Sequence, residues 1–254
     1  MSRVAQSLRV CVSWVITPIY ILLFVSILCV FHLLQHAAAL FGKGPQKAAL
    51  DLMNLAIIWN IRLVTGARYR VIGAPHMPID RPVIIVSNHQ SMYDIPMIMW
   101  ECRAREIGFI AKKELGRWIP SISFALRTLG SVLIDRSDPQ GSVLAIQKFG
   151  EMKEREKQVA SIFPEGTRAR KGEMRKFKAT GFRVLLAAMP HALIQPVVIR
   201  GNWELLQYNF LPVPYGTSIE LEFLSPIEPG TTPPDELLQT VESSIVAAVG
   251  QPAH

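Results

Sequence analysis

A long uncharged segment near the amino terminus limits what this chain can fold into. Residues 10–34 are almost wholly apolar and contain no Asp, Glu, Lys or Arg. A helix of this length is able to cross a bilayer. Half of the chain is apolar, its mean hydropathy is +0.25, and its formal net charge is +7 with a pI near 9.5. This combination indicates contact with a membrane surface or an anionic ligand.

A second apolar segment follows closely. Between residues 48 and 64 apolar side chains recur at helical spacing, namely Leu50, Met53, Ile57, Ile58, Ile61 and Val64. The two segments predict a helical hairpin over residues 1–66, which either spans the membrane or lies embedded at the surface of one leaflet. The alternative is that the second helix packs on a globular domain. The basic residues that flank the first segment are too evenly divided to set its orientation.

After Gly66 the sequence changes to short elements of alternating type. Apolar, β-rich runs predict strands at 69–72, 83–87, 107–111, 131–134, 160–163, 194–199 and 219–223. Helical spacing predicts helices at 91–100, 120–128, 139–157, 179–189 and 233–249, the last with Thr232 as its cap. We therefore predict that residues 67–254 form one α/β domain, with a central, mostly parallel or mixed sheet flanked by helices.

A polar cluster directly follows the predicted strand at 83–87. It reads Asn88-His89-Gln90-Ser91-Met92-Tyr93-Asp94. A carboxylate that holds an imidazole in one tautomer makes a general base, and His89 and Asp94 are spaced so that Asp94 can fold back on His89. The alternative is structural, because Ser91 and Asp94 also match a capping box at the start of a helix.

Other predicted strands also end in charged residues. Lys112 closes one, Arg136 follows a second, and a third runs into Pro164-Glu165-Gly166-Thr167-Arg168. A basic stretch comes after this turn, with Arg170, Lys171, Arg175, Lys176 and Lys178, and it is either a solvated loop or the rim of a phosphate site. Because ligands bind at the carboxyl ends of strands in open α/β sheets, this convergence predicts a site for an anionic substrate.

Four motifs together resemble a known family. They are Asn88-His89-Gln90-Ser91-x-x-Asp94, Gly130-x-x-x-Ile134-x-Arg136, Phe163-Pro164-Glu165-Gly166-Thr167-Arg168 and Gln195-Pro196-Val197. Their order and spacing are similar to those of the glycerolipid acyltransferases, especially the bacterial 1-acylglycerol-3-phosphate acyltransferases. The resemblance covers roughly residues 70–200. It implies transfer of an acyl group from acyl-CoA or acyl carrier protein to the sn-2 hydroxyl of lysophosphatidic acid, giving phosphatidic acid.

The resemblance also implies a role for each motif residue. His89 takes the proton of the acceptor hydroxyl, Asp94 orients His89, and the hydroxyl attacks the thioester directly. The acceptor-binding residues are Arg136, Glu165, Gly166, Thr167 and Arg168, and Lys112 stands where the family often binds phosphate. Backbone amides near Ser91 are expected to stabilise the oxyanion. No cofactor is expected. The location implied is the bacterial inner membrane, with the catalytic domain on the cytoplasmic side.

Some positions depart from the family pattern and leave alternatives open. Met92, Leu133 and Ala169 differ from the common residues and put the acceptor in doubt. The same reaction on another lysolipid, such as a lyso-ornithine lipid or a lysophospholipid, is the nearest alternative. A membrane lipid-binding protein without turnover is a second.

Two further function classes, a metal hydrolase and a nucleic-acid-binding protein, are disfavoured. A metal hydrolase would need ligands, but only His32 and His36 have suitable spacing and no acidic residue lies near them. The three cysteines form no Cys-x-x-Cys motif, so neither a disulfide framework nor a zinc site is predicted. No nucleic-acid-binding motif is present, so we do not expect a nucleic acid partner.

Overall fold

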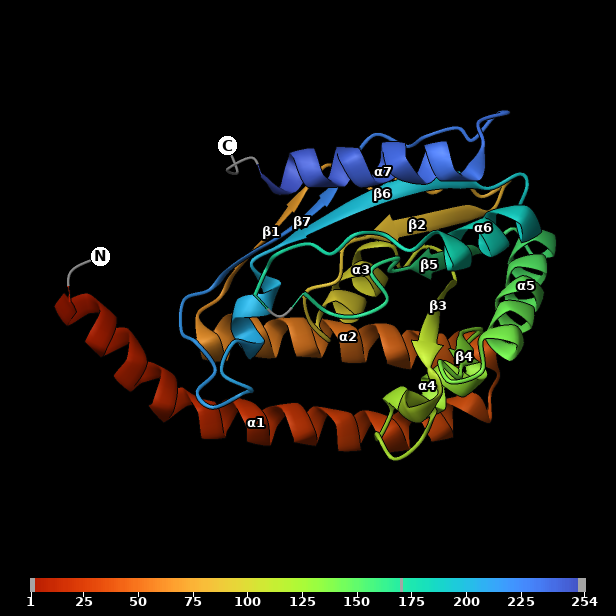
Figure 1. The fold of residues 1–254 in the computed structure, drawn as a ribbon. Helices are drawn as coiled ribbons and strands as arrows, with labels where there is room; N and C mark the ends of the chain where they lie inside the picture. Colours follow the sequence, from red (N-terminus) through yellow and green to blue (C-terminus); the bar gives the residue numbers. More distant parts are fainter. Residues whose placement is uncertain (1–2, 170, 251–254) are drawn as a thin grey trace.

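The amino-terminal part of the protein is a pair of long helices. The computed structural model describes residues 3–169 and 171–250. Helices α1 (Arg3–Ala39) and α2 (Lys43–Thr65) run antiparallel along one edge of the molecule (Figure 1). Gly66 ends α2 with a φ of 64°, a conformation that glycine adopts without steric cost. Strand β1 then begins at Arg68.

One sheet organises the rest of the described chain. Its strands are β1 (Arg68–Ile72), β2 (Val83–Ser87), β3 (Ile107–Lys112), β4 (Val132–Ile134), β5 (Val159–Ile162), β6 (Leu193–Arg200) and β7 (Ser218–Phe223). Their order is β1-β7-β6-β2-β5-β3-β4. Only the β6–β7 pair is antiparallel among these neighbours. The predicted α/β fold with a mostly parallel, mixed sheet is therefore confirmed.

Helices cover both faces of this sheet (Figure 1). The helical pair, α3 (Asp94–Glu101) and α4 (Ile122–Thr128) pack on one face around a core that includes Ile57, Tyr93 and Val197. Helices α5 (Pro139–Arg155), α6 (Ala179–Ala188) and α7 (Pro234–Val249) pack on the other. Every residue of β2 is buried, as expected for a parallel strand covered on both sides. Two short 3₁₀ helices complete the fold, η1 (Lys113–Gly116) and η2 (Asn202–Leu206).

Helix α1 is attached to the α/β part near both of its ends. Toward its amino end, the hydroxyls of Ser13 and Thr17 accept hydrogen bonds of 2.9 Å from the amides of Tyr215 and Val213. Toward its carboxyl end, His32 Nδ1 accepts a bond of 3.0 Å from the amide of Ser121. Between these contacts α1 lies along the domain, whereas its amino-terminal turns extend beyond it (Figure 1).

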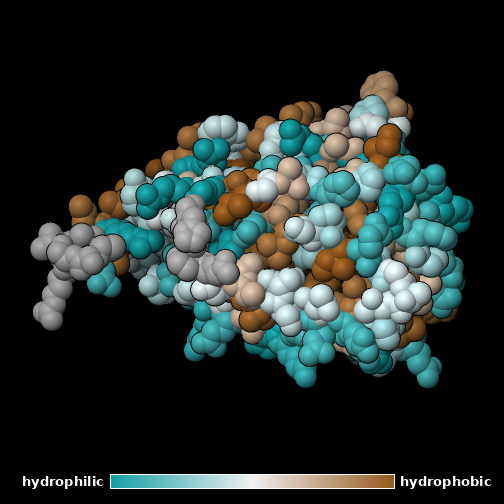
Figure 2. Space-filling model, turned by 90° about the horizontal axis from the view of Figure 1, so that it is seen from above, coloured by the Kyte–Doolittle hydropathy of each residue, from teal (hydrophilic) through white to brown (hydrophobic). Residues whose placement is uncertain are grey.

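The outer side of the helical pair is apolar. Exposed side chains there include Leu8, Val10, Trp14, Val15, Ile19, Leu22, Leu23, Val25, Val30, Leu33 and Leu34 on α1, and Leu52, Trp59 and Leu63 on α2. By length and composition both helices qualify as membrane-spanning candidates. The α7 side of the molecule, opposite α1, is mainly hydrophilic with scattered apolar patches (Figure 2). The inner side of α2 packs on the domain, for example through Ile57 and Ile61.

Three helix starts of the α/β part differ from the sequence prediction, and α4 begins at Ile122 instead of residue 120. Helix α3 begins at Asp94, not at residue 91, because the Asp94 carboxylate binds the amides of Gln90 and Ser91 and closes a turn before the helix. The capping box is only half formed: the Asp94 carboxylate accepts a bond from the amide of Ser91, but the Ser91 hydroxyl accepts from the amide of Tyr93 and not from that of Asp94. Helix α7 begins at Pro234 without a side-chain cap, so the prediction of Thr232 as its cap was wrong.

Candidate active site

The predicted site residues follow the carboxyl ends of four strands that are consecutive in the sheet, β2, β5, β3 and β4. Val86 of β2 is in register with Ile162 of β5, so His89 and Glu165 each lie three positions beyond a paired residue. Lys112 of β3 is in register with Ile134 of β4, and Arg136 follows two positions later. Parallel strand register thus places residues from distant segments along one edge of the sheet.

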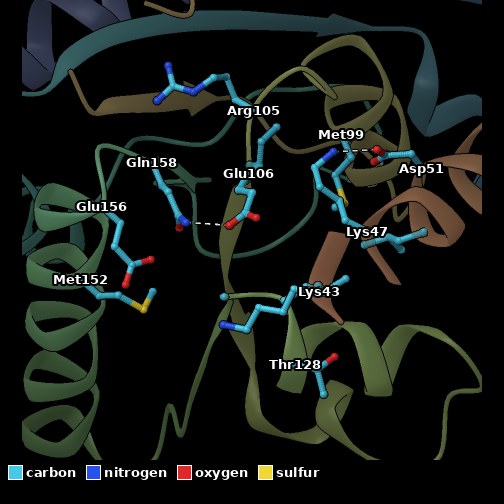
Figure 3. Close-up of a pocket in the computed structure, with 14 residues that line it drawn as sticks. Lys43, Lys47, Asp51, Met99, Arg105, Glu106, Thr128, Met152, Glu156 and Gln158 are labelled. Atoms are coloured by element: carbon cyan, nitrogen blue, oxygen red, sulfur yellow. Dashed lines mark hydrogen bonds and ion pairs between the residues drawn. The ribbon is translucent and has the colours of Figure 1, made fainter. Parts of the chain in front are cut away.

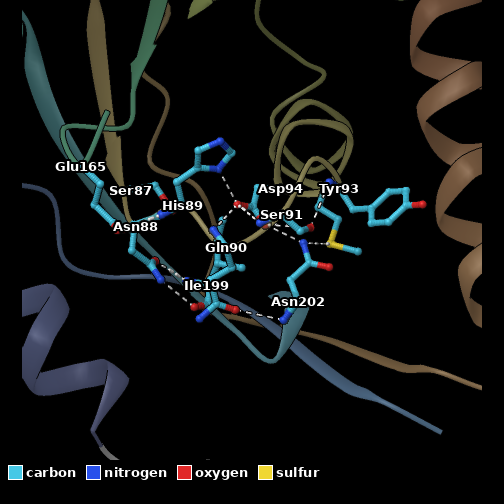
Figure 4. Close-up of polar contacts among 11 residues, drawn as sticks. Ser87, Asn88, His89, Gln90, Ser91, Tyr93, Asp94, Glu165, Ile199 and Asn202 are labelled. Atoms are coloured by element: carbon cyan, nitrogen blue, oxygen red, sulfur yellow. Dashed lines mark hydrogen bonds and ion pairs between the residues drawn. The ribbon is translucent and has the colours of Figure 1, made fainter. Parts of the chain in front are cut away.

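His89 and Asp94 form a direct pair. His89 Nδ1 lies 2.8 Å from Asp94 Oδ2, and the same oxygen accepts bonds of 2.6 and 3.0 Å from the amides of Gln90 and Ser91. The Asp94 side chain is 0% exposed and that of His89 is 17% exposed. The edge of the imidazole that carries Nε2 points away from this network (Figure 4). With its Nδ1 proton bonded to a carboxylate, the ring presents Nε2 as a free base.

Three amides near Ser91 already have hydrogen-bond partners within the fold. Those of Gln90 and Ser91 both donate to the carboxylate of Asp94, and that of Tyr93 donates to the Ser91 hydroxyl. A donor that is already bonded to a charged acceptor inside the fold is not free to bind a developing oxyanion. These amides orient Asp94 instead.

Glu165 binds the backbone on both sides of the site. Its Oε1 accepts a bond of 2.8 Å from the amide of His89, and its Oε2 accepts one of 3.0 Å from the amide of Arg175. The amide of Ala169 donates to the carbonyl of His89 at 2.7 Å. Burial raises the pKa of the Glu165 carboxyl, and the two amide bonds partly oppose this shift. Glu165 therefore holds the general-base candidate in place from within the fold.

Phe163 supports the imidazole from its face. The rings of His89 and Phe163 are stacked, with centroids 4.2 Å apart and planes 18° apart. Phe163 in turn stacks on Phe109 at 6.2 Å. This contact fixes the plane of the imidazole ring.

The basic candidates differ in their surroundings. Arg168 lines a cavity together with Gln90, which directly follows His89 in the chain, and with Trp203, Leu206, Asn209 and Phe210. Lys112 and Arg136 are exposed at the same sheet edge. Neither Asp135 nor Asp138 pairs with Arg136: Asp135 binds Lys113 at 2.8 Å, and Asp138 caps α5 through the amide of Gly141.

The remaining residues of the third motif shape its turn. Gly166 has a φ of 70°, which the predicted tight turn requires, and its amide donates to the carbonyl of Phe163. Thr167 is exposed. Arg170 of the predicted basic stretch lies outside the described residues.

Sequence reasoning missed Asn202, which contacts the dyad from another strand. Its Nδ2 donates to Asp94 Oδ1 at 2.6 Å, and it lies two residues beyond the end of β6 (Figure 4). Asn88 makes two bonds of 2.8 Å to the amide and carbonyl of Ile199 in the same strand. The available signal was the position of Asn202 after a buried strand, the same signal that pointed to His89.

Another pocket lies at the opposite ends of the strands. Figure 3 shows it between the start of α2, the starts of β3 and β5 and the end of α5, with Lys43, Lys47, Glu106, Glu156 and Gln158 among its lining residues. No predicted site residue lines it. Within the described ranges, no group of three or more His, Cys, Asp or Glu side chains is arranged to hold a metal ion.

Comparisons with known proteins agree on a family. A family model for acyltransferases matches residues 68–200, just over half of the chain. Human 1-acyl-sn-glycerol-3-phosphate acyltransferase alpha is 31% identical over 157 residues, which cover 62% of this chain and 54% of that protein. The 1-acyl-sn-glycerol-3-phosphate acyltransferase of Pseudomonas aeruginosa is 34% identical over 124 residues, covering 49% of this chain and 47% of that protein. The chain thus spans about half the length of these curated relatives.

One solved structure is similar over its full length. The crystal structure of the 1-acyl-sn-glycerophosphate (LPA) acyltransferase PlsC from Thermotoga maritima matches with a TM-score of 0.73 and 23% sequence identity, and the match covers all of both chains. At this level of identity the likeness concerns the fold.

Proposed function

The chain belongs to the acyltransferase family, and from this premise we propose that it transfers a fatty acyl group from a thioester to the sn-2 hydroxyl of 1-acylglycerol 3-phosphate. The product is phosphatidic acid. One observation carries the proposal: Asp94 holds His89 through Nδ1, and Arg168 lines a cavity with Gln90, the residue next to His89. Relatives named 1-acyl-sn-glycerol-3-phosphate acyltransferase support this choice of acceptor.

The geometry supports a direct transfer with His89 as general base. His89 Nε2 removes the proton of the acceptor hydroxyl while the hydroxyl oxygen attacks the thioester carbonyl. The carbon–sulfur bond of the tetrahedral intermediate then breaks, and the imidazolium returns the proton to the leaving thiolate. Asp94 stabilises the imidazolium between these steps. No covalent acyl-enzyme is needed, and Ser91 acts in the turn instead of as a nucleophile.

The basic residues supply the acceptor site. Arg168 binds the phosphate from the wall of the cavity, because its fork matches phosphate oxygens. Lys112 and Arg136 add positive charge along the same sheet edge. The backbone of Glu165, Gly166 and Thr167 sets the course of the loop that presents Arg168. The donor is acyl-CoA or acyl carrier protein, and both carry the same thioester.

An assay of the purified protein tests this function. With palmitoyl-CoA and lysophosphatidic acid, the wild-type protein releases free thiol and forms phosphatidic acid, whereas His89→Ala is slower by a factor of at least about 100. Equal thiol release by both proteins would refute the role of His89. No release by the wild type would favour a lipid-binding protein without turnover.

The motif positions Met92, Leu133 and Ala169 differ from the common pattern and bear on the choice of acceptor. A panel of lysophosphatidic acid, lyso-ornithine lipid and lysophospholipids with larger headgroups decides between acceptors. The highest kcat/KM with lysophosphatidic acid supports the proposal. A clear preference for a lysolipid without a terminal phosphate assigns the second candidate function.

The exposed apolar side chains of the helical pair support membrane association of the domain. We assign membrane contact to residues 1–66 and catalysis to residues 67–254, on the cytoplasmic side of a bacterial inner membrane. Helix α1 has 37 residues and is about 55 Å long, against a hydrocarbon core of about 30 Å. Its contacts with the domain near both ends favour a position within one leaflet over a crossing. Protease accessibility of a tag inserted in the turn between α1 and α2, in sealed vesicles, separates these two arrangements, because a spanning hairpin exposes that turn on the side opposite the catalytic domain.

A further inference from the structure

Asn202 completes a closed ring of hydrogen bonds around the Asp94 carboxylate. Its side-chain Nδ2 donates to Asp94 Oδ1 at 2.6 Å. Its backbone amide donates to Gln90 Oε1 at 3.0 Å, and the amide of Gln90 donates to Asp94 Oδ2 at 2.6 Å. Figure 4 shows the Asn202 side chain reaching Asp94 from the side opposite His89. Each carboxylate oxygen therefore has its own donors, and the group cannot rotate without breaking several bonds.

The two carboxylate oxygens of Asp94 have different hydrogen-bond partners. Oδ2 faces His89 Nδ1 at 2.8 Å, whereas Oδ1 faces Asn202. The Ser91 hydroxyl is a weaker second contact for Oδ1, at 3.5 Å. Asn202 is thus the main donor to Oδ1 among the described residues. A strong bond to one oxygen of a carboxylate aims the other, in the way that an outer hydrogen-bond partner orients a catalytic ligand.

The burial of Asn202 fits a positioning role. Both Asn202 and Asp94 are 0% exposed, so water does not replace the bond if it is lost. Asn202 Oδ1 has no hydrogen-bond partner within the described residues. An unpaired buried amide oxygen makes the free energy of folding less favourable. Asn202 is nevertheless buried here, with its Nδ2 bonded to the Asp94 carboxylate.

From this geometry we propose that Asn202 is a positioning residue for the His89–Asp94 pair. It holds Asp94 Oδ1 so that Oδ2 stays aligned with His89 Nδ1 and the imidazole presents Nε2 to the acceptor hydroxyl. This inference rests on the proposed acyl transfer, and it adds a residue from the end of β6 that lies outside the four motifs.

The kinetic test compares Asn202→Ala in two backgrounds. In the wild-type background kcat falls about tenfold or more, a part of the roughly 10²–10⁴ that a positioned base contributes, and KM for the acceptor is unchanged. In the His89→Ala background Asn202→Ala causes no further loss, because there is no imidazole left to align. Equal losses in both backgrounds, or wild-type kcat in Asn202→Ala, would overturn the proposal.

A second variant uses pH as the readout. Asn202→Asp places a second carboxyl against Asp94, and only its protonated form donates to Oδ1. The activity of Asn202→Asp relative to the wild type therefore rises as the pH falls. A ratio that does not change with pH contradicts the positioning role.

A spectroscopic test is independent of turnover. In protein labelled with ¹⁵N-histidine, the His89 Nδ1 proton, assigned by its absence in His89→Ala, exchanges slowly in the wild type and rapidly in Asn202→Ala. Asn60→Ala is the matched control, because Asn60 is also buried, also donates from Nδ2 and also leaves Oδ1 unpaired, but lies on α2. It leaves the His89 signal and kcat unchanged. Slow exchange in Asn202→Ala would refute the positioning role. If exchange is slow in the wild type and rapid in Asn202→Ala, but the wild type transfers no acyl group, only the proposed function is refuted.

Discussion

The carboxylate of Glu165 accepts a hydrogen bond of 2.8 Å from the backbone amide of His89, although 76 positions separate the two residues. The amide of Ala169 donates to the His89 carbonyl from the same loop. Both backbone polar groups of His89 are therefore bound by the chain that follows β5. The loop that carries Arg168 is therefore hydrogen-bonded directly to the backbone of His89, the general-base candidate. The same contacts position both the proposed acceptor site and the base.

We expect Glu165→Gln to lower both stability and activity. An amide offers one oxygen, so it satisfies only one of the two backbone donors of His89 and Arg175. The unpaired buried donor lowers the free energy of unfolding by about 1–3 kcal/mol. Displacement of His89 lowers kcat about tenfold or more. Urea unfolding and steady-state kinetics measure the two effects. Glu173→Gln, an exposed change in the same loop, is the control and keeps wild-type values.

We expect Phe163→Leu to lower kcat about two- to tenfold, because an aromatic stack contributes roughly 0.5–1.5 kcal/mol beyond its buried area. The stacked ring orients His89. Phe163→Tyr retains the ring and keeps most of the activity. Steady-state kinetics at saturating donor compares the variants. If the leucine variant matched the wild type, the stack would have no part in the reaction.

We expect Arg168→Ala and Arg136→Ala to raise the KM for lysophosphatidic acid, each by roughly tenfold or more, because hydrogen bonds to charged groups contribute about 1.5–3 kcal/mol. A monoacylglycerol, which lacks the phosphate, serves as the comparison acceptor and shows no change in KM. Arg117→Ala is the control, since Arg117 is exposed like Arg136 but belongs to no motif. An unchanged KM in both site variants would remove the phosphate assignment.

Lys153 makes stability depend on pH. Its side chain is 1% exposed and its Nζ donates to Gln158 Oε1 at 2.7 Å. Burial lowers its pKa from 10.5 to about 8. Between these values the unfolded chain holds more protons than the folded one, so the free energy of unfolding rises with pH, by up to about 3 kcal/mol.

Denaturant unfolding from pH 7 to 11 measures this effect as the difference in the free energy of unfolding between the wild type and Lys153→Met, which rises with pH. The difference between the wild type and Lys148→Met, an exposed lysine on the same helix, does not vary with pH. A flat difference for Lys153→Met as well would show that the buried ammonium is not perturbed.

Local patterns predicted the elements well because they depend on neighbouring residues. The run at 83–87 coincides with β2, and the start of β7 at Ser218 lies one residue from the predicted boundary. Helix starts were less accurate where a tertiary contact intervenes. Helix α3 begins later than predicted because the Asp94 carboxylate accepts bonds from the amides of Gln90 and Ser91 and also contacts His89. Helical periodicity in the sequence does not reveal these contacts.

The sequence by itself determined an amino-terminal apolar pair, an alternating α/β chain and polar clusters at strand ends, since each is written in the spacing of adjacent residues. It also placed His89 and Asp94 within reach of each other. The tertiary structure alone decided which strand ends are neighbours. Pairing of β2 with β5 on one side and β6 on the other brings Glu165 and Asn202 to the dyad. Strand pairing depends on burial of contacts far apart in the chain, and no local pattern specifies it.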